Sequence, residues 1–195
     1  MGVCYHSAMN APQTSSDSPA SDSVSPQSAA QMLTAAIGQI RFARQYTLEL
    51  LDATPKDQWF EIPDGLPSNV AWQVGHLTVS QYGLLMFRIR GRQPEDLELI
   101  PGKFRKTYGR GTTPSCETSS QPSPDELLER FDQVFQKGVA EIEAVAPDVL
   151  LEPVEMPYAA YPTKLGAVLF CPLHEHLHAG QIGMLRRALG LDPIR

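Results

Sequence analysis

Apolar residues recur at intervals of three or four along four segments of the chain, which is the spacing of one face of an α-helix. The segments cover about residues 29–51, 69–90, 123–145 and 163–190. No other part of the chain alternates between apolar and polar residues in the way that indicates a strand. The pattern therefore predicts an all-α protein, built as an antiparallel four-helix bundle.

Short polar residues and prolines mark where these helices begin and bend. Ser68 precedes the second segment and is expected to cap it with its hydroxyl. Ser123, Pro124 and Glu126 give a stronger signal, because a serine cap, a proline in the first turn and a glutamate three residues after the cap are typical of a capping box. Pro172 lies within the fourth segment, where it is expected to kink the helix.

Two stretches lack helical periodicity. Residues 1–28 are rich in Ser, Pro, Ala, Gln and Asp, carry no Lys or Arg, and have too little apolar surface to bury. We interpret them as a disordered or loosely ordered tail, and residues 29–195 as the folded domain. Residues 91–122 are rich in Gly, Pro, Thr and Ser, and we interpret them as a long loop, which at this length is usually functional or disordered.

Composition and charge narrow the functional classes. The net charge of −6 at pH 7 argues against general binding to nucleic acid. No apolar run approaches the ~20 residues of a membrane-spanning helix, and the first residues lack the features of a secretory signal. The three cysteines, Cys4, Cys116 and Cys171, are odd in number and widely spaced, which favours free thiols. We therefore expect a cytoplasmic protein that does not enter a membrane.

Three of the five histidines lie within five residues, at His174, His176 and His178. On a helix, His174 and His178 project from the same face one turn apart, so both imidazoles can bind one metal ion. His176 lies about 200° around the helix from His174 and points elsewhere. The pair therefore supplies two candidate metal ligands.

The same residues also spell H-E-x-x-H, the helix signature of zinc proteases, with Glu175 as the general base. A protease needs a third ligand further along the chain. In the extended motif that position falls on Met184, and the sole acidic residue after His178 is Asp192. The protease interpretation therefore lacks a third ligand.

His76 is the remaining candidate for a third ligand, because it lies midway along a different predicted helix. A single histidine on an apolar face more often packs in the core than binds a metal. The paired face of the fourth helix changes that balance, since metal sites in four-helix bundles are built from inward side chains on facing helices. Three histidine ligands would leave the metal an open position, which suits catalysis better than a structural role.

Two further residues are weaker candidates around these ligands. Trp72 lies one turn before His76 and could form a wall of the pocket, although plain core packing is the simpler interpretation. Gln181 lies one turn after His178 on the same face and could hold a ligand by a hydrogen bond. A packing role explains Gln181 equally well.

Cys171 and Glu175 are the last candidates on the fourth helix. Cys171 lies one turn before His174 and could face the site, but a buried, inert thiol is the preferred interpretation. Glu175 points about 100° away from His174, and we interpret it as a solvated residue rather than a general base.

The segment 88–110 is the one basic region, with seven Lys and Arg residues against three acidic ones. Most of it is expected to be a solvated loop. As a hypothesis, part of this charge could hold an anionic substrate beside the metal.

Three motifs together resemble the DinB/YfiT-like superfamily: N-V-A-W-Q-V-G-H-L at 69–77, H-E-H-L-H-A-G-Q-I at 174–182, and R-R-A-L-G at 186–190. The resemblance covers about residues 29–191. It implies a four-helix bundle of up-down-down-up topology with a long crossover between the second and third helices. It also implies that His76, His174 and His178 bind a divalent transition metal, with Zn or Ni as the favoured ions.

The resemblance implies a function as well. Members of this family include transferases that use low-molecular-weight thiols such as mycothiol, bacillithiol or glutathione as cosubstrates. By this likeness we expect a metal-dependent thiol transferase, or a hydrolase, that acts on a small molecule. Two alternatives stay open: a non-catalytic metal-binding or sensing protein, which could act as a homodimer, and a helical interaction module whose histidines only pack.

Overall fold

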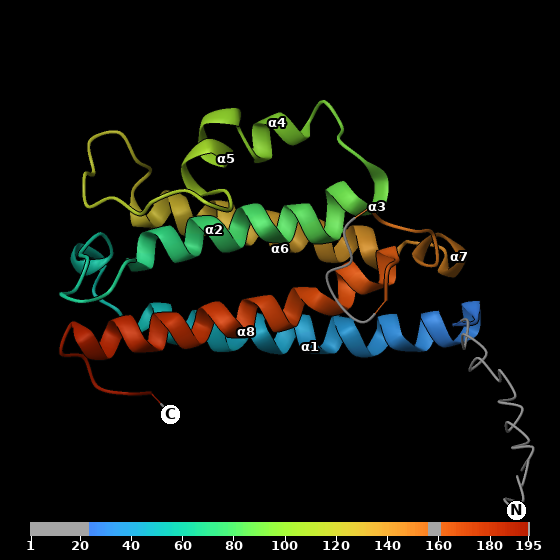
Figure 1. Ribbon diagram of the computed structural model, residues 1–195, viewed down its shortest axis with the longest axis horizontal. Coiled ribbons are helices and arrows are strands. Elements are labelled where there is room, and N and C mark those ends of the chain that lie inside the picture. Colours follow the sequence, from blue (N-terminus) through green and yellow to red (C-terminus); the bar gives the residue numbers. More distant parts are fainter. Residues whose placement is uncertain (1–23, 156–160, 195) are drawn as a thin grey trace, which may run out of the picture.

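The computed structural model describes residues 24–155 and 161–194, so most of the predicted tail lies outside the described residues (Figure 1). Helix α1 begins at Pro26, three residues before the expected start of the domain. The Ser25 hydroxyl caps it by accepting a hydrogen bond of 3.1 Å from the Ser28 N–H. A serine cap followed by proline in the first turn explains the earlier start.

Four long helical stretches form the bundle, and the described residues contain no strand, which confirms the all-α prediction. Helix α1 packs mainly against α8, and α2 packs against α6 and α8. In Figure 1, α1 and α8 run in one direction, while α2 and α6 run in the other. The long stretches are α1 (Pro26–Asp52), α2 (Val70–Tyr82) with its continuations η2 (Gly83–Phe87) and α3 (Arg88–Arg90), α6 (Pro124–Glu143) and α8 (Lys164–Ala188).

The helix ends differ in part from the prediction. The capping box at Ser123 is confirmed, with its hydroxyl on the Glu126 N–H and the glutamate carboxylate on the serine N–H. The cap of α2 is Asn69 rather than Ser68: the Asn69 side-chain oxygen accepts from the Trp72 N–H at 2.8 Å. Asparagine and serine cap equally well, so the choice depended on one residue of register. Helix α8 runs without a break past Pro172.

The interpretation of residues 91–122 as a long loop is wrong in part, because the segment contains two short helices. They are α4 (Asp96–Leu99) and α5 (Gly102–Tyr108). Figure 1 shows them as a layer over α2 and α6. Phe104 and Tyr108 are buried there and join the core of the bundle. Two further short helices, η1 (Lys56–Gln58) and α7 (Pro147–Leu150), lie in the other connections.

No helix in the described part of the chain is both long enough and apolar enough to cross a bilayer.

Candidate metal centre

The structure brings His76, His174 and His178 together in the interior of the bundle. His76 comes from α2, and the other two come from successive turns of α8. One imidazole nitrogen from each residue lies within 4.8 Å of the other two. The ring centroids are 4.5 to 5.4 Å apart. The three side chains therefore form one cluster that could hold a metal ion.

The protein fixes the orientation of His76 from both sides of the ring. Its Nδ1 lies 2.9 Å from the backbone oxygen of Tyr108, and because a carbonyl only accepts, Nδ1 carries the proton. Nε2 is left with its lone pair for a ligand, 3.3 Å from the Ser80 hydroxyl. Trp72 stacks on the imidazole with 4.7 Å between centroids and 7° between planes. Trp72 therefore packs directly against His76, as its position one turn earlier on the helix allows.

His178 is oriented by a side chain rather than by backbone. Its Nδ1 hydrogen bonds to the amide oxygen of Gln73, and the Gln73 nitrogen donates to the Ser68 hydroxyl at 2.8 Å. The Nδ1 of His178 therefore also carries the proton, and Nε2 is free to bind a ligand. The sequence interpretation did not include Gln73, although it lies one turn before His76 on α2.

Gln181 lies beside His178 on the outer side of the cluster. It is exposed, and its side chain hydrogen bonds to His178. With Trp72, Gln73 and Met184 it lines a shallow cavity of about 340 Å³. Gln181 therefore contacts His178, which its position one turn later on the same helix face allows.

All three histidines are held in their neutral form. Burial, together with the neighbouring imidazoles, lowers the pKa of His178 to about 3 and that of His174 to about 4. Burial also lowers the pKa of His76, against the opposing effect of its hydrogen bond to Tyr108. Neutral imidazole is the form that binds metal, so near pH 7 no proton has to leave before an ion enters.

The third histidine of the motif, His176, lies on the opposite side of α8. Its ring stacks on Phe42 and Tyr46, with centroid distances of 5.9 and 6.5 Å. Its Nδ1 lies 2.8 Å from the backbone oxygen of Pro172. The helical geometry that separates it from His174 was evident from the spacing.

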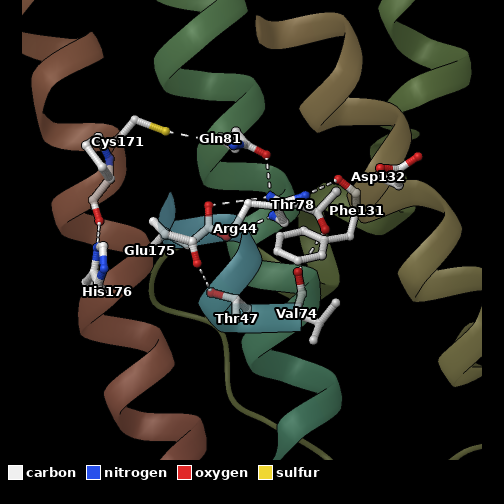
Figure 2. A network of polar contacts seen from close by, with 12 residues as sticks. Arg44, Thr47, Val74, Thr78, Gln81, Phe131, Asp132, Cys171, Glu175 and His176 are labelled. Carbon is white, nitrogen blue, oxygen red and sulfur yellow. Dashed lines mark hydrogen bonds and ion pairs between the residues drawn. The ribbon is translucent and has the colours of Figure 1, made fainter. Parts of the chain in front are cut away.

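Glu175 is not solvated, contrary to the sequence interpretation. It is 2% exposed and forms an ion pair of 2.8 Å with Arg44, which is 3% exposed (Figure 2). Arg44 also donates to the amide oxygen of Gln81 at 2.7 Å and to the backbone oxygen of Phe131 at 2.9 Å. The four residues come from α1, α2, α6 and α8, so this network joins all four long helices.

Cys171 belongs to this network rather than to the histidine cluster. Its sulfur lies 3.9 Å from the Gln81 amide nitrogen, and Figure 2 shows the two side by side. Burial, together with the charge of Glu175, raises the pKa of the thiol far above its ordinary value. Cys171 is therefore a buried, protonated thiol, as preferred from the sequence. Cys116 is a free, exposed thiol, and Cys4 lies outside the described residues.

Gly75 allows α5 to approach the site. A β-carbon at this position would lie 2.4 Å from the Tyr108 ring, far inside van der Waals contact. Tyr108 therefore packs directly on the α2 backbone. Its backbone carbonyl accepts the hydrogen bond from His76, the residue after Gly75. Burial raises the pKa of Tyr108 to about 12, so its phenol stays neutral.

The cluster opens into a larger cavity of about 680 Å³, the size of a small-molecule site. Two of the histidines, His76 and His174, lie on its wall. The rest of its lining comes from α2, η2, α3, α5, α8 and the segments that follow α3 and α5. It consists of Val79, Ser80, Tyr82, Gly83, Leu84, Phe87, Arg88, Arg92, Arg105, Arg110 and Phe170.

Fold and site together define a class: a four-helix bundle with three inward histidines on two facing helices. A family model described as the DinB superfamily matches residues 39–182, and that span includes all three histidines. Since the match covers well over half of the chain, the protein belongs to the DinB superfamily. No curated protein matches the chain.

Proposed function

We propose that the protein is an enzyme that depends on a divalent transition metal held by His76, His174 and His178, and that it acts on a small molecule. The observation that carries this proposal is the convergence of three neutral imidazole nitrogens within 4.8 Å at the wall of a cavity of about 680 Å³. Histidines that only pack in the core would not need to lie on the wall of a cavity of this size.

The residues fit such an ion in number, type and protonation state. Zn²⁺ and similar ions bind histidine nitrogen at about 2.1 Å, which places the ligands of a tetrahedral site about 3.4 Å apart. The three nitrogens lie within 4.8 Å of one another, so the rings need only turn slightly toward the ion. Three protein ligands also leave an open coordination position, which is typical of catalytic sites.

The surrounding residues prepare the site for chemistry. Tyr108 and Gln73 hold the Nδ1–H groups of His76 and His178, so that both Nε2 atoms face the cluster. Val79, Leu84 and Phe170 add apolar surface to the cavity wall. A bound divalent metal would supply Lewis acidity that lowers the pKa of a thiol or of water. The reaction that we propose is therefore thiol transfer to an electrophile, with hydrolysis as the related alternative.

Metal binding is tested by elemental analysis of untagged protein that is purified without nickel-affinity chromatography. We expect about one equivalent of transition metal in the wild type, and its loss in His76→Ala and in His178→Ala. The matched control is His176→Ala, which removes an imidazole from the same helix but outside the cluster and should keep the metal. A wild type that binds no ion even after incubation with Zn or Ni would overturn the proposal.

Catalysis is tested separately on the metal-loaded protein. A panel of low-molecular-weight thiols is offered with an aryl chloride, and thioether formation, with release of chloride and a proton, is followed by absorbance. Activated esters without thiol test the hydrolase alternative. Turnover that is lost in His178→Ala and kept in His176→Ala supports an enzyme. A metal-loaded protein without turnover in either arm would favour the non-catalytic metal-binding alternative.

A further inference from the structure

Four arginines face the same cavity as the histidines. They are Arg88, Arg92, Arg105 and Arg110, and they come from α3, from α5 and from the segments that follow these two helices. Among the described residues that line this cavity, none is acidic. The cavity is therefore strongly positive in a protein whose net charge is −6.

The buried acidic residue of the same segment binds a different arginine. Asp96 is buried, and it binds Arg90 through two hydrogen bonds of 2.8 Å. Arg90 also pairs with Glu141 at 2.7 Å. Asp96 therefore pairs with Arg90, which does not line the cavity.

Three of the cavity arginines, Arg92, Arg105 and Arg110, keep their charge available. Within residues 24–155 and 161–194, none of Arg92, Arg105 and Arg110 forms an ion pair with a carboxylate. Arg92 hydrogen bonds to Tyr82, a neutral partner. Like charges that gather around one space repel each other, and a bound anion relieves that repulsion.

The position of Arg88 indicates how long a molecule must be to contact both the histidines and the arginines. Its guanidinium donates to the backbone oxygen of Gly83 at 2.7 Å, so the side chain lies back along the helix toward His76. Gly83 lies seven residues after His76, which is about 10 Å along a helix axis. A molecule that touches both ends is therefore larger than a simple ion and matches the volume of the cavity.

We propose that the cavity binds a small molecule that carries a carboxylate or phosphate group, with the anionic end among these four arginines and the other end beside the histidines. Guanidinium groups bind both kinds of anion by paired hydrogen bonds. The binding of the anion rests on the arginines alone, whereas its role as a substrate rests on the proposed function.

The test is isothermal titration of the metal-free full-length protein at low salt. Inorganic phosphate and glutarate are the two anionic probes and distinguish the two chemistries, and neutral glutaramide is the control for shape. The variant is Arg105→Gln/Arg110→Gln, because both side chains are exposed and neither forms an ion pair in the described chain. The matched control is Lys106→Gln, which removes a charge from the same helix but not from the cavity lining.

We expect saturable binding of at least one anion and none of glutaramide. Loss of the two arginines should weaken it at least about tenfold, the effect of losing charge-assisted hydrogen bonds, while Lys106→Gln changes it less than about twofold. Restoring charge with Arg105→Lys/Arg110→Lys should recover part of the affinity. The inference is overturned by an absence of saturable anion binding, or by equal affinities in the wild type and the double variant, or by an equal loss in Lys106→Gln.

Metal content, measured on the same protein preparations before the metal is removed, separates this inference from the proposed function. Wild type that binds the anion but no metal would overturn the proposed function and leave the anion site standing. Wild type that binds metal but no anion would overturn the anion site alone. The double arginine variant should keep its metal, because neither arginine contacts the histidines.

Discussion

Helix α8 carries two buried polar clusters on adjacent faces, and they balance their polar groups in different ways. Glu175 meets the opposite charge of Arg44, and the guanidinium is further held by Gln81 and by the backbone of α6. The arginine also lies 3.3 Å from the centroid of the Phe131 ring. In this cluster the charges and most of the hydrogen-bonding capacity are matched by the protein itself.

In the histidine cluster, the protein satisfies the hydrogen-bonding capacity of the imidazoles only in part. The Nδ1 atoms of His76 and His178 have close protein partners, whereas the Nε2 of His76 has a longer contact, 3.3 Å from the Ser80 hydroxyl. No carboxylate belongs to this cluster in the described chain. The difference indicates a division of labour: the matched cluster holds the helices in place, and the half-matched cluster is suited to an external ion.

Removal of Glu175 should have the largest effect on stability. Glu175→Ala leaves Arg44 as an unpaired charge in the core, and loss of one partner of a buried pair costs about 3–5 kcal/mol. The free energy of unfolding, measured by urea denaturation, should fall by this amount. The double variant Arg44→Met/Glu175→Leu should recover much of the loss. Equal instability of single and double variants would show that shape, and not the unpaired charge, is at fault.

Metal should stabilise the second cluster and leave the first unaffected. At a free Zn²⁺ concentration one hundred times the Kd, the wild type should gain about 2.7 kcal/mol in unfolding free energy, because the ion binds only the folded state. His178→Ala should gain little, and His176→Ala should gain as much as the wild type. Thermal unfolding with and without zinc measures the three values. A similar gain in all three proteins would place the ion elsewhere.

Acid should weaken a third paired cluster, Arg90–Asp96–Glu141, in a defined pH range. Hydrogen bonds from Arg90 hold the pKa of Asp96 at about 2, below its ordinary value of 3.8. A lowered pKa means that this stabilisation is present above pH 3.8 and is lost as the pH falls through 2. It amounts to on the order of 2 kcal/mol. Urea unfolding of wild type and Asp96→Asn should therefore differ most above pH 3.8 and converge near pH 2. A constant difference would contradict the assignment.

The smallest expected effect comes from Gln73. Gln73→Leu removes the group that orients the Nδ1–H of His178, and loss of such a partner weakens metal binding by about tenfold. Zinc affinity, measured by competition with a chromogenic chelator, checks this value. Gln181→Leu, on the exposed side of the same histidine, is the control and should weaken binding less. The reverse order would make Gln181 the orienting residue.

The sequence predicted the parts of the site that depend on local geometry. The spacing of His174 and His178 places them on one helix face wherever the helix lies, and Ser123 forms its capping box within four residues. Glu175 was misinterpreted because its partner Arg44 lies 131 residues away, and a single charged residue carries no sign that it is buried. Its burial is a property of the packed bundle.

The layer over α2 was missed for a similar reason. Helices α4 and α5 have four and seven residues, which is too short for a helical period to stand out. The contact from Tyr108 to His76 uses a backbone carbonyl, which every residue possesses. Gly75 was the available signal: glycine inside a helix costs about 1 kcal/mol relative to alanine, so its presence there indicates a close neighbour.

The segment η2 (Gly83–Phe87) is a π-helical turn, and it decides which arginine lines the cavity. A regular α-helix turns about 100° per residue, so Arg88 would lie about 120° around the axis from His76. A π-helical turn holds about one residue more and rotates everything after it back by about 100°. Arg88 thereby comes onto the cavity side, while Arg90 turns toward Asp96 and Glu141. Two arginines that lie two positions apart in the sequence thus acquire opposite roles through the phase of one helix, and a one-residue deletion there would change the site more than many substitutions.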